Sequence, residues 1–141
     1  MNKLMAGAIV IAMFLLAGCG ARGPKLATSA EDIVGTWQRT SGGPRYVQFL
    51  EDGTAHSSVG LKAVIEGHGQ DQWKYRFGGT QLFIEETLGV CEEIPTGIYE
   101  VRMLENGNLR FVEIEDECAS RVSFLAGRAD EGRIREYEPV P

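Results

Sequence analysis

The residues of this chain that could do chemistry are two histidines, three cysteines and a group of carboxylates. His56 lies beside a tight turn and His68 in a glycine-flanked loop, and their spacing matches no metal-ligand motif. Cys91 and Cys118 lack the Cys-x-x-Cys spacing of a redox-active pair. No nucleophile is paired with a base in a catalytic motif. The sequence therefore predicts no catalytic residues, no metal site and no cofactor, and the protein is not expected to be an enzyme.

An acidic collar surrounds the loops that hold these two cysteines. Oxygen-rich clusters can bind calcium, but the spacing of an EF-hand is not present, and a solvated face is the simpler interpretation. The same carboxylates could instead attract a basic protein, because complementary charge steers association. The collar consists of Glu92, Glu93, Glu113, Glu115, Asp116 and Glu117.

The charge balance argues against nucleic acid as a partner. The 141 residues carry 14 Lys and Arg against 20 Asp and Glu, a formal net charge of −6. Nucleic acids are bound through clustered basic residues, and here the basic residues are scattered singly among acids. Anionic lipid head groups are disfavoured for the same reason.

The chain begins with the pattern of a secretory signal. Lys3 supplies a positive start, and residues 4–16 form an apolar core. An uncleaved anchor helix is the alternative, but the run is shorter than the roughly 20 residues needed to cross a bilayer. We therefore expect residues 1–18 to be a removable signal peptide.

That segment ends on Leu16-Ala17-Gly18-Cys19, which resembles the lipobox of bacterial lipoproteins. The resemblance implies cleavage before Cys19, a diacylglycerol on its sulfur and attachment to the lipid bilayer in the cell envelope. Gly20 resembles the sorting signal for the outer membrane, where the organism has one. We expect residues 19–30 to be the lipidated cysteine and a flexible tether, residues 31–137 the barrel domain, and residues 138–141 a tail.

The remainder of the chain alternates apolar and polar residues in short runs, which predicts an all-β domain. Asp52-Gly53, Gly78-Gly79 and Asn106-Gly107 mark tight hairpins. Closure of the resulting meander removes both sheet edges, so we expect an eight-stranded antiparallel up-and-down barrel. In the strand expected at residues 108–115, Leu109 and Phe111 point to one face and Val112 and Ile114 to the other. A bulge near Phe111 would bring these apolar residues onto the same face. The expected strands span residues 34–40, 44–51, 54–60, 71–77, 80–86, 97–104, 108–115 and 120–126.

The meander also predicts a disulfide. With Cys19 assigned to lipid, Cys91 and Cys118 remain as an even pair in an oxidising compartment. Loops of a meander alternate between two ends, so the loops after the fifth and seventh expected strands lie at the same end. We therefore predict a Cys91–Cys118 disulfide.

Three short motifs resemble those of small bacterial lipocalin-like (calycin-type) lipoproteins. They are Gly35-Thr36-Trp37, the run Phe-Leu-Glu-Asp-Gly-Thr at 49–54, and Asp-Glu-Cys-Ala-Ser-Arg at 116–121. In lipocalins, an arginine from the last strand covers the tryptophan of the first in a cation-π contact that closes one barrel end. The resemblance implies that Trp37 is covered either by Arg128, which fits the geometry, or by Arg121, which fits the motif.

Aromatic residues dominate the expected barrel interior. They either fill it as a simple core or line a site for a small apolar ligand, with the loop at residues 60–70 as its mouth. The sequence leaves three function classes to compare: a ligand-binding lipoprotein, a protein-interaction or inhibitory module that uses the acidic end, and an enzyme, for which no catalytic residues can be named. Residues 41–46 faintly resemble a motif of small lipoproteins that inhibit lysozyme. The expected ligand-binding residues are Phe49, Trp73, Tyr75, Tyr99 and Phe111.

Overall fold

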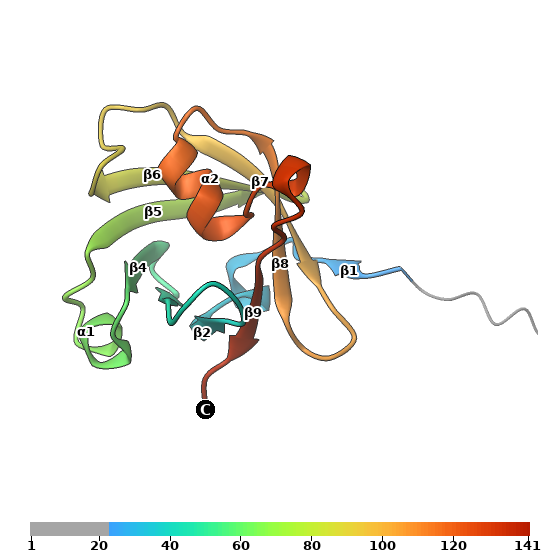
Figure 1. The fold of residues 1–141 in the computed structure, drawn as a ribbon, viewed down its shortest axis with the longest axis horizontal. Helices are drawn as coiled ribbons and strands as arrows, with labels where there is room; N and C mark the ends of the chain where they lie inside the picture. The colour runs from blue at the N-terminus through green and yellow to red at the C-terminus, as the bar shows by residue number, and fades with distance from the viewer. Residues whose placement is uncertain (1–22) are drawn as a thin grey trace, which may run out of the picture.

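The computed structural model describes residues 23–141, so the predicted signal peptide and Cys19 lie outside the described residues. Eight antiparallel strands form a closed up-and-down barrel, which confirms the predicted fold (Figure 1). Each strand pairs with the next in the chain, and the last pairs with both the first and the seventh of the barrel. The strands are β2 (Gly35–Arg39), β3 (Tyr46–Phe49), β4 (Thr54–Ser58), β5 (Asp71–Gly78), β6 (Gln81–Leu88), β7 (Gly97–Met103), β8 (Leu109–Glu115) and β9 (Glu136–Pro139).

The predicted hairpins are present. Gly53 joins β3 to β4 at φ 81°, and Gly107 joins β7 to β8 at φ 85°. Both angles lie in the region that residues with a Cβ rarely adopt, which is why glycine occupies these turns. Short α1 (Leu61–Ile65) lies in the expected mouth loop after β4. Within residues 23–141 no helix has the length and apolar character needed to span a membrane.

Aromatic side chains fill the barrel interior as a connected stack. The Phe49 ring centroid lies 5.2 Å from that of Tyr75 and 5.9 Å from that of Phe111. Tyr137 continues the stack at 5.5 Å from Phe111. All four residues are buried. Such edge and offset contacts stabilise the fold beyond the contribution of the surface area that the rings bury. The rings therefore act as the core of the barrel.

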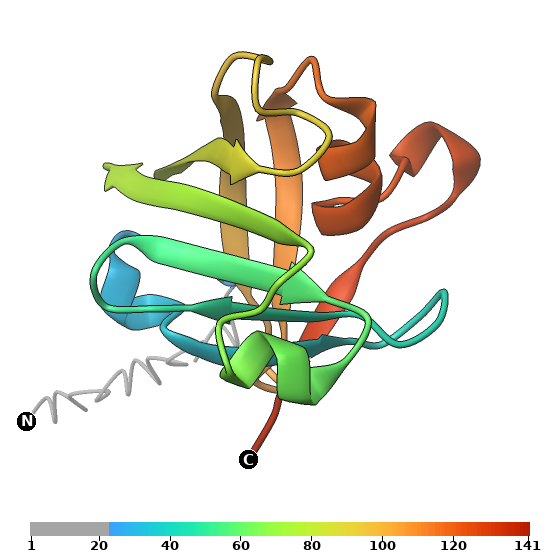
Figure 2. The ribbon, with the colours of Figure 1, turned by 90° about the vertical axis from the view of Figure 1, so that its left-hand side faces the viewer.

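The predicted strand at residues 120–126 is wrong, because this segment forms helix α2 (Ala119–Leu125). Val122 and Leu125 are buried at helical spacing, and the Phe124 ring reaches 5.5 Å from that of Trp73 inside the barrel. The helix covers the barrel mouth beside β8 (Figure 2). The eighth strand is instead β9, so residues 138 and 139 of the predicted tail belong to the sheet and pair with β2.

Residues 25–30 of the expected tether pack against the barrel. β1 (Lys25–Leu26) pairs with the end of β7, Ala27 is fully buried, and the 3-10 helix η1 (Ala30–Asp32) follows. The prediction of a flexible spacer is therefore wrong for residues 25–30. Apolar contacts of Ala27 with the core hold this segment against the barrel.

The bulge in β8 lies later than predicted. Ile98 pairs with Glu115 and Tyr99 with Glu113, so Ile114 is the extra residue. Phe111, the predicted position, pairs regularly with Val101. The bulge turns Ile114 outward while the apolar residues of the first half of β8 stay in the core.

Candidate functional site

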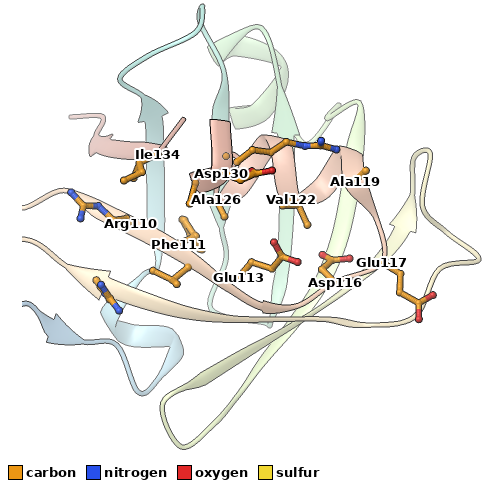
Figure 3. Close-up of a pocket in the computed structure, with 15 residues that line it drawn as sticks. Arg110, Phe111, Glu113, Asp116, Glu117, Ala119, Val122, Ala126, Asp130 and Ile134 are labelled. Atoms are coloured by element: carbon orange, nitrogen blue, oxygen red, sulfur yellow. The ribbon is translucent and has the colours of Figure 1, made fainter. Parts of the chain in front are cut away.

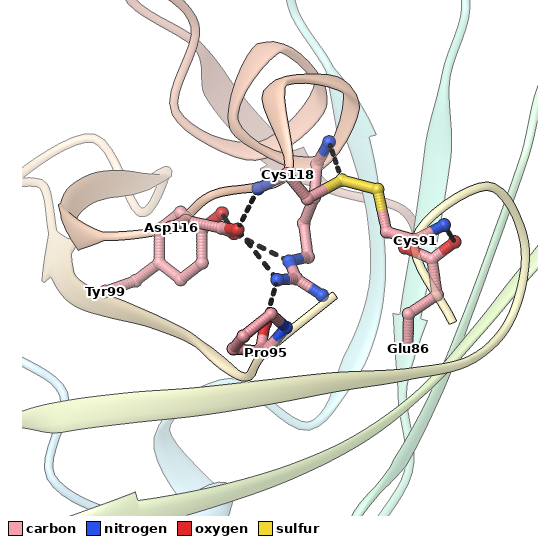
Figure 4. The surroundings of a disulfide bond; sticks show 7 residues. Glu86, Cys91, Pro95, Tyr99, Asp116 and Cys118 are labelled. Atoms are coloured by element: carbon pink, nitrogen blue, oxygen red, sulfur yellow. Dashed lines mark hydrogen bonds and ion pairs between the residues drawn. A yellow bond between two sulfur atoms is a disulfide. The ribbon is translucent and has the colours of Figure 1, made fainter. Parts of the chain in front are cut away.

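The predicted disulfide is present and joins two loops at one end of the barrel (Figure 4). The Cα atoms of Cys91 and Cys118 lie 6.1 Å apart. Cys91 lies in the loop between β6 and β7, and Cys118 is the N-cap of α2, where its sulfur accepts a hydrogen bond from the Arg121 amide at 3.2 Å. The disulfide therefore fixes the start of α2 against the β6–β7 loop.

A buried ion pair adjoins the disulfide. Arg121 Nε donates to Asp116 Oδ2 at 2.6 Å, and Nη2 donates to Asp116 Oδ1 at 2.7 Å and to the Pro95 carbonyl at 2.8 Å. Both side chains are fully buried. The Tyr99 hydroxyl and the Cys118 amide also donate to Asp116. The β6–β7 loop, β7, the segment after β8 and α2 are therefore joined through this ion pair.

These partners keep the pair ionised. Burial alone would raise the pKa of Asp116, but the hydrogen bonds from Arg121, Tyr99 and the Cys118 amide outweigh it and hold the pKa below its usual range. Burial, together with the bond to Asp116, raises the pKa of the Tyr99 hydroxyl. Neither group titrates near neutral pH, so the cluster suits a structural role rather than proton transfer.

Gly97 at the start of β7 makes room for this cluster. A Cβ at this position would collide with the Asp116 carboxylate and lie 2.9 Å from the Tyr99 ring. The absence of a side chain lets Asp116 approach the β7 backbone and accept the Tyr99 hydroxyl hydrogen bond.

Glu86 is a second buried carboxylate beside the disulfide. It is 5 % exposed, and its Oε1 accepts the Cys91 amide at 2.9 Å. An oxygen of Glu86 and both sulfurs lie within 4.8 Å of one another. The two sulfurs are joined in the disulfide, so neither is a thiolate able to bind a metal. Burial raises the pKa of Glu86.

We expect Glu86→Gln to stabilise the protein increasingly as pH rises. A raised pKa in the folded state means that the folded protein holds the proton more tightly, so ionisation of Glu86 lowers stability above the unfolded pKa of about 4.3. Glutamine keeps an oxygen for the Cys91 amide and never ionises. Urea unfolding of both proteins from pH 4 to pH 8 measures the effect, and a constant difference across this range would contradict it.

Neither candidate arginine lies over Trp37. Arg121 is bound by Asp116, and Arg128 pairs with Glu131 at 3.3 Å. In residues 23–141 the one cation-π contact is Arg76 over Phe83. Trp37 is nevertheless buried, and its Nε1 donates to the Ile33 carbonyl at 2.8 Å. The ring therefore acts through packing and this hydrogen bond.

The predicted ligand-binding residues separate into two groups. Phe49, Trp73, Tyr75 and Tyr99 are buried in the core. The Tyr75 hydroxyl donates to the Leu50 carbonyl at 2.6 Å, and burial raises the pKa of this phenol to about 12. Only Phe111 of the predicted set also lines an open cavity.

That cavity is a lateral groove between β8 and the α2 segment (Figure 3). Its volume is about 650 Å³, within the range typical of ligand sites. Ala129 and Asp130 of the 3-10 helix η2 (Ala129–Glu131) also line it. Apolar side chains form much of its surface, namely Phe111, Val112, Val122, Ala126 and Ile134.

The groove has unpaired negative charge. The carboxylates of Glu113, Glu117 and Asp130 line it and form no ion pair within residues 23–141. Its arginines are all paired with acids: Arg102 with Glu100, Arg110 with Glu136 and Arg128 with Glu131. Half of the predicted acidic collar, Glu113, Asp116 and Glu117, therefore lines the groove.

Sequence reasoning did not find the groove, because it assigned one of its walls, helix α2, to a strand. A signal was present in the repeated small residues around Val122, such as Ala119 and Ala126, whose spacing is helical and leaves space beside the helix. The assignment of this segment as a strand hid that signal.

No family model, curated protein or solved structure matches the chain. The candidate site is therefore described from the residues of this chain alone.

Proposed function

We propose that the protein is a non-catalytic interaction module of the bacterial cell envelope, which binds a basic partner in the groove between β8 and α2. The observation that carries this proposal is the set of three unpaired carboxylates, Glu113, Glu117 and Asp130, around an apolar floor. Complementary charge gives such a surface both attraction and specificity.

The packing of the interior supports an external site. The buried rings contact one another at 5.2 to 5.9 Å along the stack from Tyr75 through Phe49 to Phe111. A ligand within the barrel would have to displace core side chains, whereas the groove is open. The disulfide and the Arg121–Asp116 pair brace the end of the barrel on which the groove lies, and a braced surface loses little entropy on binding.

The lipid anchor is part of the same proposal. The leader sequence and Cys19 support a lipoprotein of lipocalin-like fold, and the closed antiparallel barrel is compatible with that fold. A diacylated cysteine would hold the module at the membrane surface, because two acyl chains give stable anchoring.

A charge-neutralising variant tests the groove. The triple variant Glu113→Gln/Glu117→Gln/Asp130→Asn removes the unpaired carboxylates. Its control, Glu51→Gln/Glu85→Gln/Glu105→Gln, removes three exposed acids elsewhere and leaves the same net charge. Fluorescence anisotropy of labelled hexalysine measures binding at low and high salt.

We expect the groove variant to weaken hexalysine binding about tenfold at low salt, because three exposed ion pairs at ~0.5 kcal/mol each give ~1.5 kcal/mol. The control should change binding less than twofold, and high salt should remove the difference. Equal losses in the two variants would show that only the net charge matters, and the groove would then not be the binding site.

A further inference from the structure

The groove contains an edge of β8 that has no neighbouring strand within residues 23–141. The Leu104 amide donates to the Asn108 carbonyl where the β7–β8 hairpin begins. Hydrogen-bonded pairs alternate along an antiparallel ladder, so Arg110 and Val112 face β7 with their amides and carbonyls. The same groups of Phe111 and Glu113 therefore face the opposite way, toward the groove.

The partner strand stops short of these two residues. β9 pairs with β8 only at Leu109 and Arg110. One residue before β9, the Arg135 amide donates instead to the Ala126 carbonyl at 3.2 Å, at the end of α2. The chain thus turns away from β8 and leaves the Phe111 and Glu113 main-chain groups without a strand partner within residues 23–141.

We infer that an extended, basic polypeptide segment binds in the groove by adding a strand to the free edge of β8 at Phe111 and Glu113. Strand addition supplies main-chain hydrogen bonds, while pockets beside the edge select alternate side chains. This inference rests on the proposed function and specifies its partner as an extended peptide.

The surroundings of the edge determine the chemistry of that segment. Phe111, Val122 and Ala126 offer apolar contacts, and Glu113, Glu117 and Asp130 offer carboxylates that have no ion-pair partner within the described part of the chain. A strand that alternates apolar and basic side chains matches both. A second copy of this chain matches poorly, because its net charge of −6 would oppose the acidic groove.

The test uses a capped hexapeptide, Lys-Val-Lys-Val-Lys-Val, and two N-methylated forms of it. One form is methylated at the amides of the lysines and the other at those of the valines. In an added strand only one of these two sets faces β8, because successive amides point to opposite edges. The two forms have the same charge and composition, so each controls for the other.

We expect the unmodified peptide to bind, one methylated form to bind at least tenfold more weakly and the other within threefold. Hydrogen exchange gives a second measurement on the same samples. The Phe111 and Glu113 amides should exchange at least tenfold more slowly with the peptide bound. The Val112 amide, which faces β7, should not change and is the internal control.

The outcomes separate the two proposals. If the peptide binds and both methylated forms bind equally well, the acidic groove stands and strand addition is overturned. If neither hexalysine nor the hexapeptide binds, both proposals fail. If the protein sediments as a dimer with the Phe111 and Glu113 amides already protected, the edge is occupied by a second copy, and the basic-peptide inference is wrong.

Discussion

Asp116→Asn is expected to destabilise the protein by about 3–5 kcal/mol, the usual cost of removing one partner from a buried ion pair. Arg121 would keep its charge in a fully buried position without the carboxylate that compensates it. Domains of this size have a free energy of unfolding of only about 5–15 kcal/mol, so the substitution would remove a large share of it. Urea unfolding followed by tryptophan fluorescence measures the loss.

The matched control is Glu100→Gln. Glu100 and Arg102 form an ion pair of similar length, 2.7 Å against 2.6 Å, but the side chains are 26 % and 39 % exposed. Exposed pairs contribute about 0–1 kcal/mol, so this variant should be nearly neutral. Similar losses in Asp116→Asn and Glu100→Gln would show that burial does not determine the effect, contrary to this prediction.

Asp116→Asn should also make the free energy of unfolding less dependent on pH in the acidic range. The pKa of Asp116 is lowered in the folded state, so its stabilising contribution is complete above the unfolded pKa of about 3.9. That contribution disappears as pH falls through the folded pKa. The difference between wild type and variant should therefore shrink below pH 4.

Removal of the disulfide has the second large expected effect. In the chain-entropy model, the cross-link between Cys91 and Cys118, 27 residues apart, stabilises the folded protein by roughly 3.6 kcal/mol. Cys91→Ala/Cys118→Ala should lower the free energy of unfolding by about this amount. Alanine suits both positions, since each is buried.

Wild-type protein unfolded in the presence of a reductant provides the comparison for this variant. Reduction breaks the same cross-link without changing the side-chain volume as the alanines do, so the two losses should agree within about 1 kcal/mol, a typical cost of a small packing defect. If both losses stay below about 1 kcal/mol, the cross-link does not constrain the unfolded chain as this model requires.

The strands were predictable where local chemistry decides the structure. The turns at Gly53 and Gly107 require positive φ, and the alternation of Trp73, Tyr75 and Phe77 in β5 marks its buried face. The pairing of Cys91 with Cys118 followed from the meander together with the assignment of Cys19 to lipid. The turns and the strand depend on residues near one another in the sequence. The disulfide depends on the simple order of strands in a meander.

The chain after Cys118 was harder to predict. Val122 and Phe124 alternate as in a strand, yet Cys118 caps a helix whose buried residues are Arg121, Val122 and Leu125. β9 ends in Pro139, and proline argues against a central strand. The groove forms where β9 stops pairing with β8. That point is set by tertiary contacts, which the local sequence of either strand does not reveal.

The position of the short β1 strand determines which end of the barrel would face the membrane. Lys25 pairs with Met103 at the far end of β7, whereas Gly97, at the opposite end, lies beside Asp116 and the disulfide. Under the proposed lipid anchor, the chain from Cys19 to Lys25 reaches at most about 20 Å. The acidic end would then face away from the bilayer, so its partners would arrive from the aqueous side.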